Sequence, residues 1–236
     1  MDRPKPQKYQ ATIVKKEQLT AFVYEVTFKL DIPSDITFIA GQTFMLSVAP
    51  GVNRTMSIAS SPSEKNSIMM CHDVFPNGPG SKWTIAKKVG DTAQFMAPLG
   101  MFVLDKESHR KKIMVATGTG IAPYRSMLLD YLSNGGTDDI TLYWGMRHEE
   151  DLYWVDEMQE LSLKYPNFIF IICLSQPKET WAGKHGRVTA HAVQEEHNIK
   201  GSDIYLCGNQ LMVKDMEILL SEHDVPKHQI FKELYY

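Results

Sequence analysis

A short glycine-containing stretch, residues 117–123, has the residue types of a phosphate-binding turn. It reads Thr-Gly-Thr-Gly-Ile-Ala-Pro and follows the apolar run 113–116, which is typical of a buried parallel strand. Gly118 and Gly120 allow the backbone to pass close to a ligand, and the amides at the start of a helix attract phosphate. Pro123 suits the first turn of such a helix, because its missing amide is no loss there. The stretch is therefore a candidate dinucleotide site.

Taken alone, this turn is equally compatible with an ordinary connection between a strand and a helix. Pro123 stands where the third glycine of a Gly-x-Gly-x-x-Gly fingerprint would be. No acidic residue ends the next strand-like run, 141–144, which is followed by Gly145, Met146 and Arg147. A dinucleotide site at this turn can therefore be inferred only if other parts of the sequence point to the same function.

A second candidate for anion binding is the stretch 77–81, Asn-Gly-Pro-Gly-Ser. It precedes a run with apolar residues at Trp83, Ile85, Ala86 and Val89. The pattern predicts a capped helix start whose amides face an anion. The alternative is a capped helix with no ligand.

Composition indicates a globular protein with two domains of unequal size. The chain has 236 residues, 43% of them hydrophobic, which is enough to fill real cores. The formal net charge of −3 is unevenly divided, because residues 1–107 hold 12 Lys and Arg against 10 Asp and Glu, a net +2. This balance does not favour nucleic acid as a partner. The mildly basic first part suits an acidic protein partner, although two solvated surfaces that differ by chance would look the same.

The cysteines and the apolar runs argue against disulfide-rich, metal-cluster and membrane-spanning proteins. Cys71, Cys173 and Cys207 are widely spaced, so neither a disulfide framework nor a cysteine-held metal cluster is expected. We expect no metal site, because His72 has no second ligand at a recognised spacing. The N-terminus lacks an apolar signal region, and the longest apolar run, 168–174, is too short to cross a bilayer. These features predict a cytoplasmic protein without a membrane span.

The periodicity of the sequence changes near residues 106–110. Before this point, residues 22–30 alternate between apolar and polar, and further β-like runs at 9–15, 44–48, 55–59, 68–74, 92–95 and 102–104 predict an antiparallel barrel. After it, apolar runs at 113–116, 140–144, 168–174, 204–207 and 230–234 alternate with helical patterns, which predicts a parallel α/β sheet. We place the domains at 1–107 and 108–236.

Residues 54–62, Arg-Thr-Met-Ser-Ile-Ala-Ser-Ser-Pro, together with the glycine turn, resemble the ferredoxin-NADP reductase family. The similarity covers nearly the whole chain; further matching positions include Gly41, Gly90, Pro98, Gly183 and Met212. It implies an FAD-binding β-barrel followed by a Rossmann-like NAD(P)-binding domain. The implied activity passes a hydride from NAD(P)H to FAD and single electrons to a separate ferredoxin, flavodoxin or oxygenase component. Two alternatives are an NAD(P)H diaphorase or flavin reductase without a protein partner, and a non-catalytic subunit of a larger complex.

The resemblance also implies roles for residues of the first half. Arg54 would pair with the FAD pyrophosphate, and the Ser57 hydroxyl would face flavin N5, which accepts the hydride. Position 56 departs from the family, since Met56 replaces the usual Tyr that stacks on the flavin, which puts this stacking in doubt. The implied FAD-binding positions are Arg54, Thr55, Met56, Ser57, Cys71, His72, Asp73, Gly80, Ser81 and Lys82.

In the second half, the resemblance implies a nicotinamide site and a terminal gate. Cys207 and Glu233 would lie beside the reactive nicotinamide carbon, and Tyr236 or Tyr235 would cover the flavin until nicotinamide displaces it. We expect Ser57, Cys207, Glu233 and Tyr236 to be catalytic. The implied nucleotide-binding positions are Thr117, Gly118, Thr119, Gly120, Pro123, Arg147, Ser175, Arg187, Cys207, Tyr235 and Tyr236.

The choice between NADH and NADPH rests on few residues. Family members that prefer NADPH usually have Arg after the serine found here as Ser175, and this chain has Gln176. Arg147 and Arg187 are placed to hold a 2′-phosphate nonetheless, so the expected cofactor is NADP or NAD, with a slight preference for NADH or dual use.

Overall fold

The structure is a computed structural model that describes residues 4–235, with the side chain of Tyr235 left out. Its contacts divide the chain into two units. The first contains residues up to Leu104 together with 122–134, and the second contains 105–121 and the residues from Gly135 onward. The helix that follows the glycine turn thus groups with the barrel, and the exact boundary at residue 107 stays a prediction.

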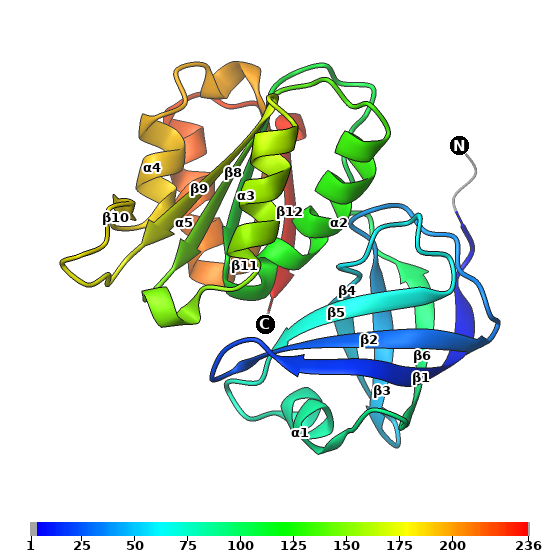
Figure 1. The fold of residues 1–236 in the computed structure, drawn as a ribbon. Helices are drawn as coiled ribbons and strands as arrows, with labels where there is room; N and C mark the ends of the chain where they lie inside the picture. The colour runs from blue at the N-terminus through cyan, green and yellow to red at the C-terminus, as the bar shows by residue number, and fades with distance from the viewer. Residues whose placement is uncertain (1–3, 236) are drawn as a thin grey trace. The chain divides into compact units, whose positions relative to one another are not determined.

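The first unit is a curled, six-stranded antiparallel sheet, as predicted (Figure 1). Its strand order is β4-β3-β6-β1-β2-β5. The strands are β1 (Gln7–Gln18), β2 (Val23–Ile32), β3 (Thr43–Ala49), β4 (Val52–Ser57), β5 (Ser67–Asp73) and β6 (Thr92–Leu99). Alternate residues point inward, so Phe28, Phe44 and Phe95 meet in one aromatic core with ring centroids 5.1–6.0 Å apart.

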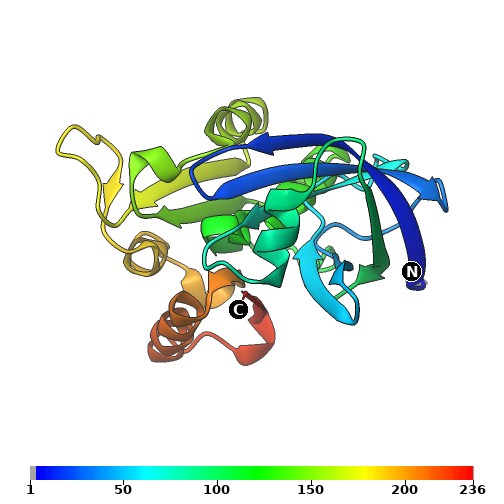
Figure 2. The ribbon, with the colours of Figure 1, turned by 90° about the horizontal axis from the view of Figure 1, so that it is seen from below.

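A hydrogen bond links the chain just beyond one outer strand of this sheet to the other outer strand, and a helix covers one end of the sheet. Just beyond β4, the Ala59 amide donates to the Met69 carbonyl on β5 at 2.7 Å. Helix α1 (Pro79–Ala86) lies across one end of the curled sheet in both views (Figures 1 and 2). Its Trp83 packs against the barrel core, with its ring centroid 6.3 Å from that of Phe28. The helix therefore closes the core at the end that carries the 77–81 motif.

Helix α2 (Ile121–Ser133) is fixed to the barrel unit by polar contacts. Arg125 Nη1 donates to the Ala59 carbonyl at 2.8 Å, and Ser126 Oγ donates to the Ser60 carbonyl at 2.7 Å. A Cβ on Gly41 would lie 2.3 Å from Met127 Cε, so this glycine permits the close packing. The helix buries the apolar side chains of Met127, Leu128 and Leu132.

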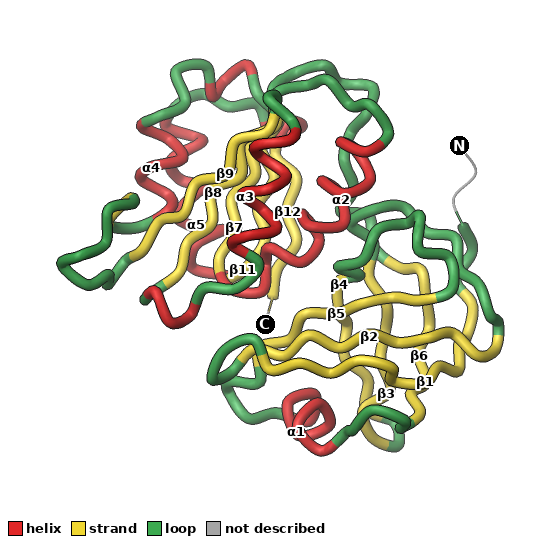
Figure 3. Tube along the Cα trace, in the orientation of Figure 1, coloured by secondary structure: helices red, strands yellow, loops and turns green. Residues whose placement is uncertain are grey.

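The second unit is a parallel sheet of order β10-β9-β8-β7-β11-β12, as predicted (Figure 3). Its strands are β7 (Lys112–Thr117), β8 (Ile140–Met146), β9 (Phe168–Leu174), β10 (Lys184–His185), β11 (Asp203–Asn209) and β12 (Ile230–Tyr235). Helices α4 (Val188–Gln194) and α5 (Gln210–Glu222) cover one face, and α3 (Val155–Lys164) lies on the other. The central strands are buried on both faces, which explains their continuous apolar sequences.

Several local predictions are wrong. Residues 102–104 form no strand, and Phe22 is 52% exposed because β2 begins one residue later. Helix α1 ends at Ala86, and both Ile85 within it and Val89 beyond it are exposed, although the sequence places them in one apolar run. Its N-cap is Gly78, with no side-chain hydrogen bond, so the predicted capped helix start has no capping side chain.

Among the residues that the structure describes, no helix has the length and apolar character needed to cross a membrane.

Candidate functional site

Three predicted FAD-binding residues meet at the start of helix α1. A Cβ built on Gly80 would lie 3.3 Å from Arg54 Cγ and 3.3 Å from His72 Cε1. Arg54 comes from β4 and His72 from β5, so the barrel brings residues that are far apart in the sequence to one helix end. The lack of a side chain at Gly80 is what permits this close approach.

The first turn of α1 is prepared for an anion. No side chain caps it, and no acidic residue lies in it. Helix starts carry unpaired amides and a partial positive charge, and the side chain of the exposed Arg54 passes beside this one at its Cγ. The Ser81 hydroxyl donates to the Pro76 carbonyl at 3.1 Å, which braces the turn, and Lys82 is exposed on the helix. Together these groups form a positive cradle that we call the barrel cradle.

His72 contributes to the barrel cradle as a neutral residue. Its Nδ1 lies 2.8 Å from Thr84 Oγ1, on the buried side of α1. Burial lowers the pKa of the His72 imidazole to about 4, so it carries no charge at neutral pH. His72 therefore links β5 to α1 without adding to the positive charge of Arg54.

The remaining predicted flavin residues lie along β4 and β5. Ser57, at the end of β4, is 6% exposed and lies opposite Thr43. Met56 is 9% exposed and belongs to the barrel core, so most of its thioether is covered by protein. Thr55 and Asp73 are exposed, and Cys71 is buried in β5. Contact of these side chains with a flavin stays a prediction.

The glycine turn of the second unit follows β7 at the point where the strand order reverses. Strand β7 pairs with β8 on one side and with β11 on the other, and later strands extend the sheet outward from both. Ligands of such sheets bind outside the carboxyl ends of the strands at this switch point. Gly118 to Gly120 form a 3₁₀ turn there, and helix α2 begins at Ile121.

Close packing of the backbone fixes this turn. A Cβ on Gly120 would lie 2.2 Å from the Cys207 carbonyl oxygen, so only glycine fits against the end of β11. Gly208 has φ +135°, and a Cβ there would lie 2.4 Å from Thr117 Oγ1. That hydroxyl accepts a 2.9 Å hydrogen bond from the Asn209 amide. The ends of β7 and β11 are therefore joined around the turn, which we call the sheet cradle.

Gly118 lies in open space, unlike the tightly packed Gly120 and Gly208. Its φ of +55° is left-handed, yet a Cβ there would have no heavy atom within 4 Å. Its carbonyl accepts a 2.9 Å hydrogen bond from Trp144 Nε1 on β8. Trp144 is fully buried and was not among the predicted site residues, because no spacing rule connects an indole to a turn 26 positions earlier.

The nicotinamide residues predicted on neighbouring strands are in register. Cys207 lies opposite Ala116 on β7 and opposite Glu233 on β12, so the structure brings Cys207 and Glu233 together. Cys207 is fully buried and Glu233 is half-buried. Backbone pairing places Tyr235 opposite Asn209, and Tyr236 lies outside the described residues.

The two arginines predicted to hold a 2′-phosphate, Arg147 and Arg187, lie farther along the same edge, with Ser175 between them in the sequence. Ser175 follows β9, and its amide donates to the Met146 carbonyl at 3.0 Å, beside the exposed Arg147. Arg187 precedes α4 and pairs with Asp215 of α5 at 3.1 Å. Thr119 is half-buried in the turn, and Pro123 is buried in the first turn of α2. A phosphate site shared by Arg147 and Arg187 stays a prediction.

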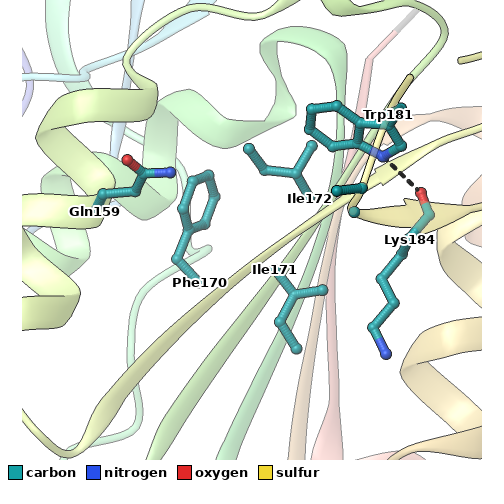
Figure 4. A pocket seen from close by; sticks show the side chains of 8 residues that line it. Gln159, Phe170, Ile171, Ile172, Trp181 and Lys184 are labelled. Carbon is teal, nitrogen blue, oxygen red and sulfur yellow. Dashed lines mark hydrogen bonds between the residues drawn. The ribbon is translucent and has the colours of Figure 1, made fainter. Parts of the chain in front are cut away.

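A hollow of about 440 Å³ lies elsewhere in the second unit (Figure 4). It is bounded by α3, β9 and residues 181–184, and Phe170 and Trp181 contribute aromatic rings. None of the predicted site residues lines it. Within the described residues, no group of three or more His, Cys, Asp or Glu is arranged to hold a metal.

Two family models match the chain. One covers the part that contains the barrel cradle, and the other covers the part that contains the sheet cradle. The model described as "Oxidoreductase FAD-binding domain" matches residues 10–104, and "Oxidoreductase NAD-binding domain" matches residues 114–217. Ferredoxin--NADP reductase B of Sorangium cellulosum is 30% identical over 237 residues, which cover 96% of this chain and 97% of that protein. The chain belongs to the ferredoxin-NADP reductase family. It is an oxidoreductase flavoenzyme with an FAD-binding and an NAD-binding domain.

Other members of this family differ in extent. The toluate 1,2-dioxygenase electron transfer component of Pseudomonas putida is 32% identical over 208 residues, which cover 87% of this chain and 61% of that protein. A ferredoxin NADP+ reductase from Neisseria gonorrhoeae, solved with bound FAD and NADP, superimposes with a TM-score of 0.84 at 21% identity and covers 99% of this chain and 100% of that one. The second match supports the fold.

The residues present fit FAD at the barrel cradle. The pyrophosphate of FAD is an anion, and an uncapped helix start with an arginine side chain passing beside it is suited to bind it. The Gly80 position shows the same fit, because a side chain there would fill the space between Arg54 and His72. Similarly, the turn at the switch point of the parallel sheet suits a second dinucleotide.

Proposed function

We propose that this chain takes a hydride from NAD(P)H onto bound FAD and passes single electrons to a separate acceptor protein. The observation that supports this most strongly is the pair of cradles, one in each unit, each suited to a different dinucleotide. The domains at 1–107 and 108–236 are part of the proposal.

On the barrel side, Arg54 and the first turn of α1 hold the FAD pyrophosphate. The hydroxyl of Ser57 faces flavin N5, and its position at the end of β4 keeps it close to the cradle residues of the same strand. When bound, FAD supplies the chemistry that converts a two-electron donor into two one-electron transfers. The protein positions the flavin and shields it.

On the sheet side, the amides of the 118–120 turn bind the pyrophosphate of the nicotinamide nucleotide. Cys207 and Glu233, paired across β11 and β12, lie beside the nicotinamide ring. Arg147 and Arg187 hold the 2′-phosphate when it is present, Ser175 belongs to the same nucleotide site, and Tyr236 or Tyr235 forms the gate. The electron balance is one NAD(P)H and two oxidised acceptors giving NAD(P)⁺, two reduced acceptors and one proton.

The acceptor is a small ferredoxin or flavodoxin in this proposal. A second candidate is the oxygenase component of a multicomponent system, and the similarity to the toluate dioxygenase electron transfer component favours it. The two candidates share the chemistry of the reductase and differ in the protein that receives the electrons.

A steady-state comparison of acceptors tests the proposal. The chain, loaded with FAD, is supplied with NADH or NADPH and with a plant-type ferredoxin, a flavodoxin, ferricyanide or free flavin. We expect protein acceptors to be reduced with either nucleotide, with NADH at least as effective. Turnover with free flavin and ferricyanide alone would instead identify a flavin reductase. Absence of turnover with every acceptor, despite bound FAD, would identify a non-catalytic subunit.

A further inference from the structure

The outer edge of strand β9 is open over most of its length. The parallel sheet ends on this side with β10, which pairs only with Cys173 and Leu174. In the described part of the chain, no other strand pairs with the outer side of β9, so residues 168–172 form an open edge. Successive residues of a parallel strand turn their backbone groups to opposite neighbours. Since the Leu174 carbonyl accepts the Gly186 amide on the outer side, the backbone groups of Phe170 point to that side too.

The hollow drawn in Figure 4 lies along this open edge. Ile171 packs against the core on the α4 and α5 face of the sheet, whereas Phe170 lies toward Gln159 of α3 on the other face. Because side chains of both faces bound the hollow, it lies at the edge of the strand rather than on one face. Its far wall is the Trp181 ring, whose Nε1 donates to the Lys184 carbonyl at 3.2 Å. The hollow is therefore space beside the backbone of β9.

Apolar side chains are exposed around this edge. Ile169 on β9 is 50% exposed, and Leu163 in the last turn of α3 is 86% exposed. An open strand edge is a template for pairing with another strand, and proteins protect such edges with charges, proline or a cover. The sequence of β9, Phe-Ile-Phe-Ile-Ile-Cys-Leu, contains no charged residue and no proline. We call residues 168–172 the β9 edge.

Other sheet edges of the molecule are protected. Strand β12, at the opposite end of the same sheet, contains Lys232 and Glu233, and Lys232 pairs with Glu217 of α5. In the antiparallel sheet, the hydrogen bond from Ala59 to Met69 links the chain beyond β4 to β5. The β9 edge differs from these edges because it is both apolar and open.

We propose that the β9 edge pairs with the β9 edge of a second copy of this chain, antiparallel and about a two-fold axis at Phe170. The sequence of the edge suits this pairing, because every position from 168 to 172 holds an aromatic or a β-branched residue. Cross-strand pairs of these residue types stabilise antiparallel strands. The pairs are Phe168 with Ile172, Ile169 with Ile171, and Phe170 with Phe170 of the second copy.

The lack of charge on the β9 edge favours a second copy as the occupant. The edge offers no charge that would attract an oppositely charged partner, and pairing with itself sets no like charges against each other. A two-fold contact of this kind closes after two copies, so both open edges are covered. The hollow beside Phe170 gives the incoming side chains room. This inference goes beyond the proposed function and holds whichever acceptor receives the electrons.

The first test measures self-association of the FAD-loaded full chain by sedimentation equilibrium over a wide range of concentrations. Ile169→Lys places a charge on the β9 edge. Its matched control is Ile218→Lys, because Ile218 is a 60% exposed isoleucine on α5 of the same unit. We expect the unaltered chain to form dimers, Ile169→Lys to raise the dimer Kd about 10-fold or more, and the control to change it less than about twofold. Circular dichroism checks that each variant is folded.

The second test examines the register of the pairing. Chains with Ile169→Cys are mixed with chains that carry Ile171→Cys, under mild oxidation, and covalent dimers are measured on non-reducing gels. The pairing sets position 169 opposite position 171 of the second copy, which is close enough for a disulfide, whereas either variant alone keeps its new cysteines apart. The three native cysteines are buried. We expect covalent dimers in the mixture and few in either variant alone.

Three results would overturn the proposal: a chain that stays monomeric at every concentration, equal effects of the two lysine variants, or a mixture without cross-links. A fourth would replace it. If the chain stays monomeric but binds an extended peptide of alternating Thr and Val, with the same loss in Ile169→Lys, the β9 edge is a site for a foreign strand and the pairing with a second copy is wrong.

Discussion

The barrel cradle and the sheet cradle are both suited to a dinucleotide pyrophosphate, but they are built in different ways. In the barrel cradle the positive charge comes from Arg54, an exposed side chain whose hydrogen bond is to the neighbouring Asn53 carbonyl. In the sheet cradle, backbone packs on backbone, with Gly120 against Cys207. The Arg54 side chain can be replaced without changing the fold. In the sheet cradle, the backbone that would bind the pyrophosphate is itself packed against the end of β11. Substitutions should therefore affect binding and stability together in the sheet cradle and separately in the barrel cradle.

The largest effect is expected for Gly120→Ala in the sheet cradle. The added Cβ would lie 2.2 Å from the Cys207 carbonyl oxygen, so the turn or the end of β11 must move. We expect a loss of about 1–3 kcal/mol in stability, and a fall of about 100-fold in the rate of flavin reduction at low NAD(P)H. Stopped-flow reduction and thermal unfolding measure the two effects.

Gly118→Ala is the matched control for that variant. A Cβ at this position meets open space, and the strain of a left-handed alanine costs about 1–2 kcal/mol. The rate should fall less than about 30-fold, and FAD content should stay unchanged in both variants. Equal losses in the two variants would show that contact with Cys207 is not what fixes the turn.

In the barrel cradle, Arg54→Gln should weaken FAD binding by about 10- to 100-fold, because a charged hydrogen bond to the pyrophosphate is lost. The Tm of the FAD-free protein should not change, since Arg54 is exposed. Fluorescence titration with FAD and thermal unfolding without it measure the two quantities. An unchanged Kd for FAD, or a lower Tm without it, would contradict the separation of binding from fold.

His72 provides a pH-dependent test of the same cradle. Its pKa is about 4 in the folded protein against 6.5 for the free group, so the unfolded chain binds more protons between these values. Stability is therefore full above pH 6.5 and is lost as pH falls toward 4, by an amount on the order of 2 kcal/mol. Chemical denaturation of the FAD-free protein at pH 7 and pH 4.5, compared with His72→Asn, measures this loss. A variant that loses as much stability as the unaltered chain would show that His72 is not the titrating group.

The smallest effect is expected for Trp144→Phe. The variant removes the indole hydrogen bond to the Gly118 carbonyl and keeps an aromatic ring in the core. We expect the Kd for NAD(P)⁺ to rise about 3- to 10-fold, with no change in FAD binding. If both dinucleotides were affected equally, the hydrogen bond would not act on the sheet cradle alone.

The sequence predicts the two architectures because their periodicities differ. Alternating residues in β2 and apolar runs in β7 and β8 follow directly from a sheet with one buried face and a sheet with two. Helix α1 was predicted less well, because Trp83, Ile85 and Val89 do not share one helical face. The helix ends at Ala86 and buries Thr84 instead.

The cradles themselves were only partly predictable. The motifs around Arg54 and Gly118 are local in the sequence, so they were recognised as candidate sites. Contacts such as Gly120 with Cys207 join residues 87 positions apart, and they depend on β7 and β11 being neighbours in the sheet. No local pattern specifies that neighbour relation, and the same reason explains why Trp144 was missed.

The central claim is that the barrel cradle binds FAD and that NAD(P)H bound at the sheet cradle reduces it. The most direct measurement is anaerobic stopped-flow mixing of the FAD-loaded chain with NADH and, separately, with NADPH, followed at the flavin absorption band. The account predicts that the band bleaches with at least one nucleotide, at a rate that saturates with its concentration and falls sharply in Gly120→Ala. A folded protein that stays colourless when supplied with FAD, or a bound flavin that neither nucleotide reduces, would contradict it.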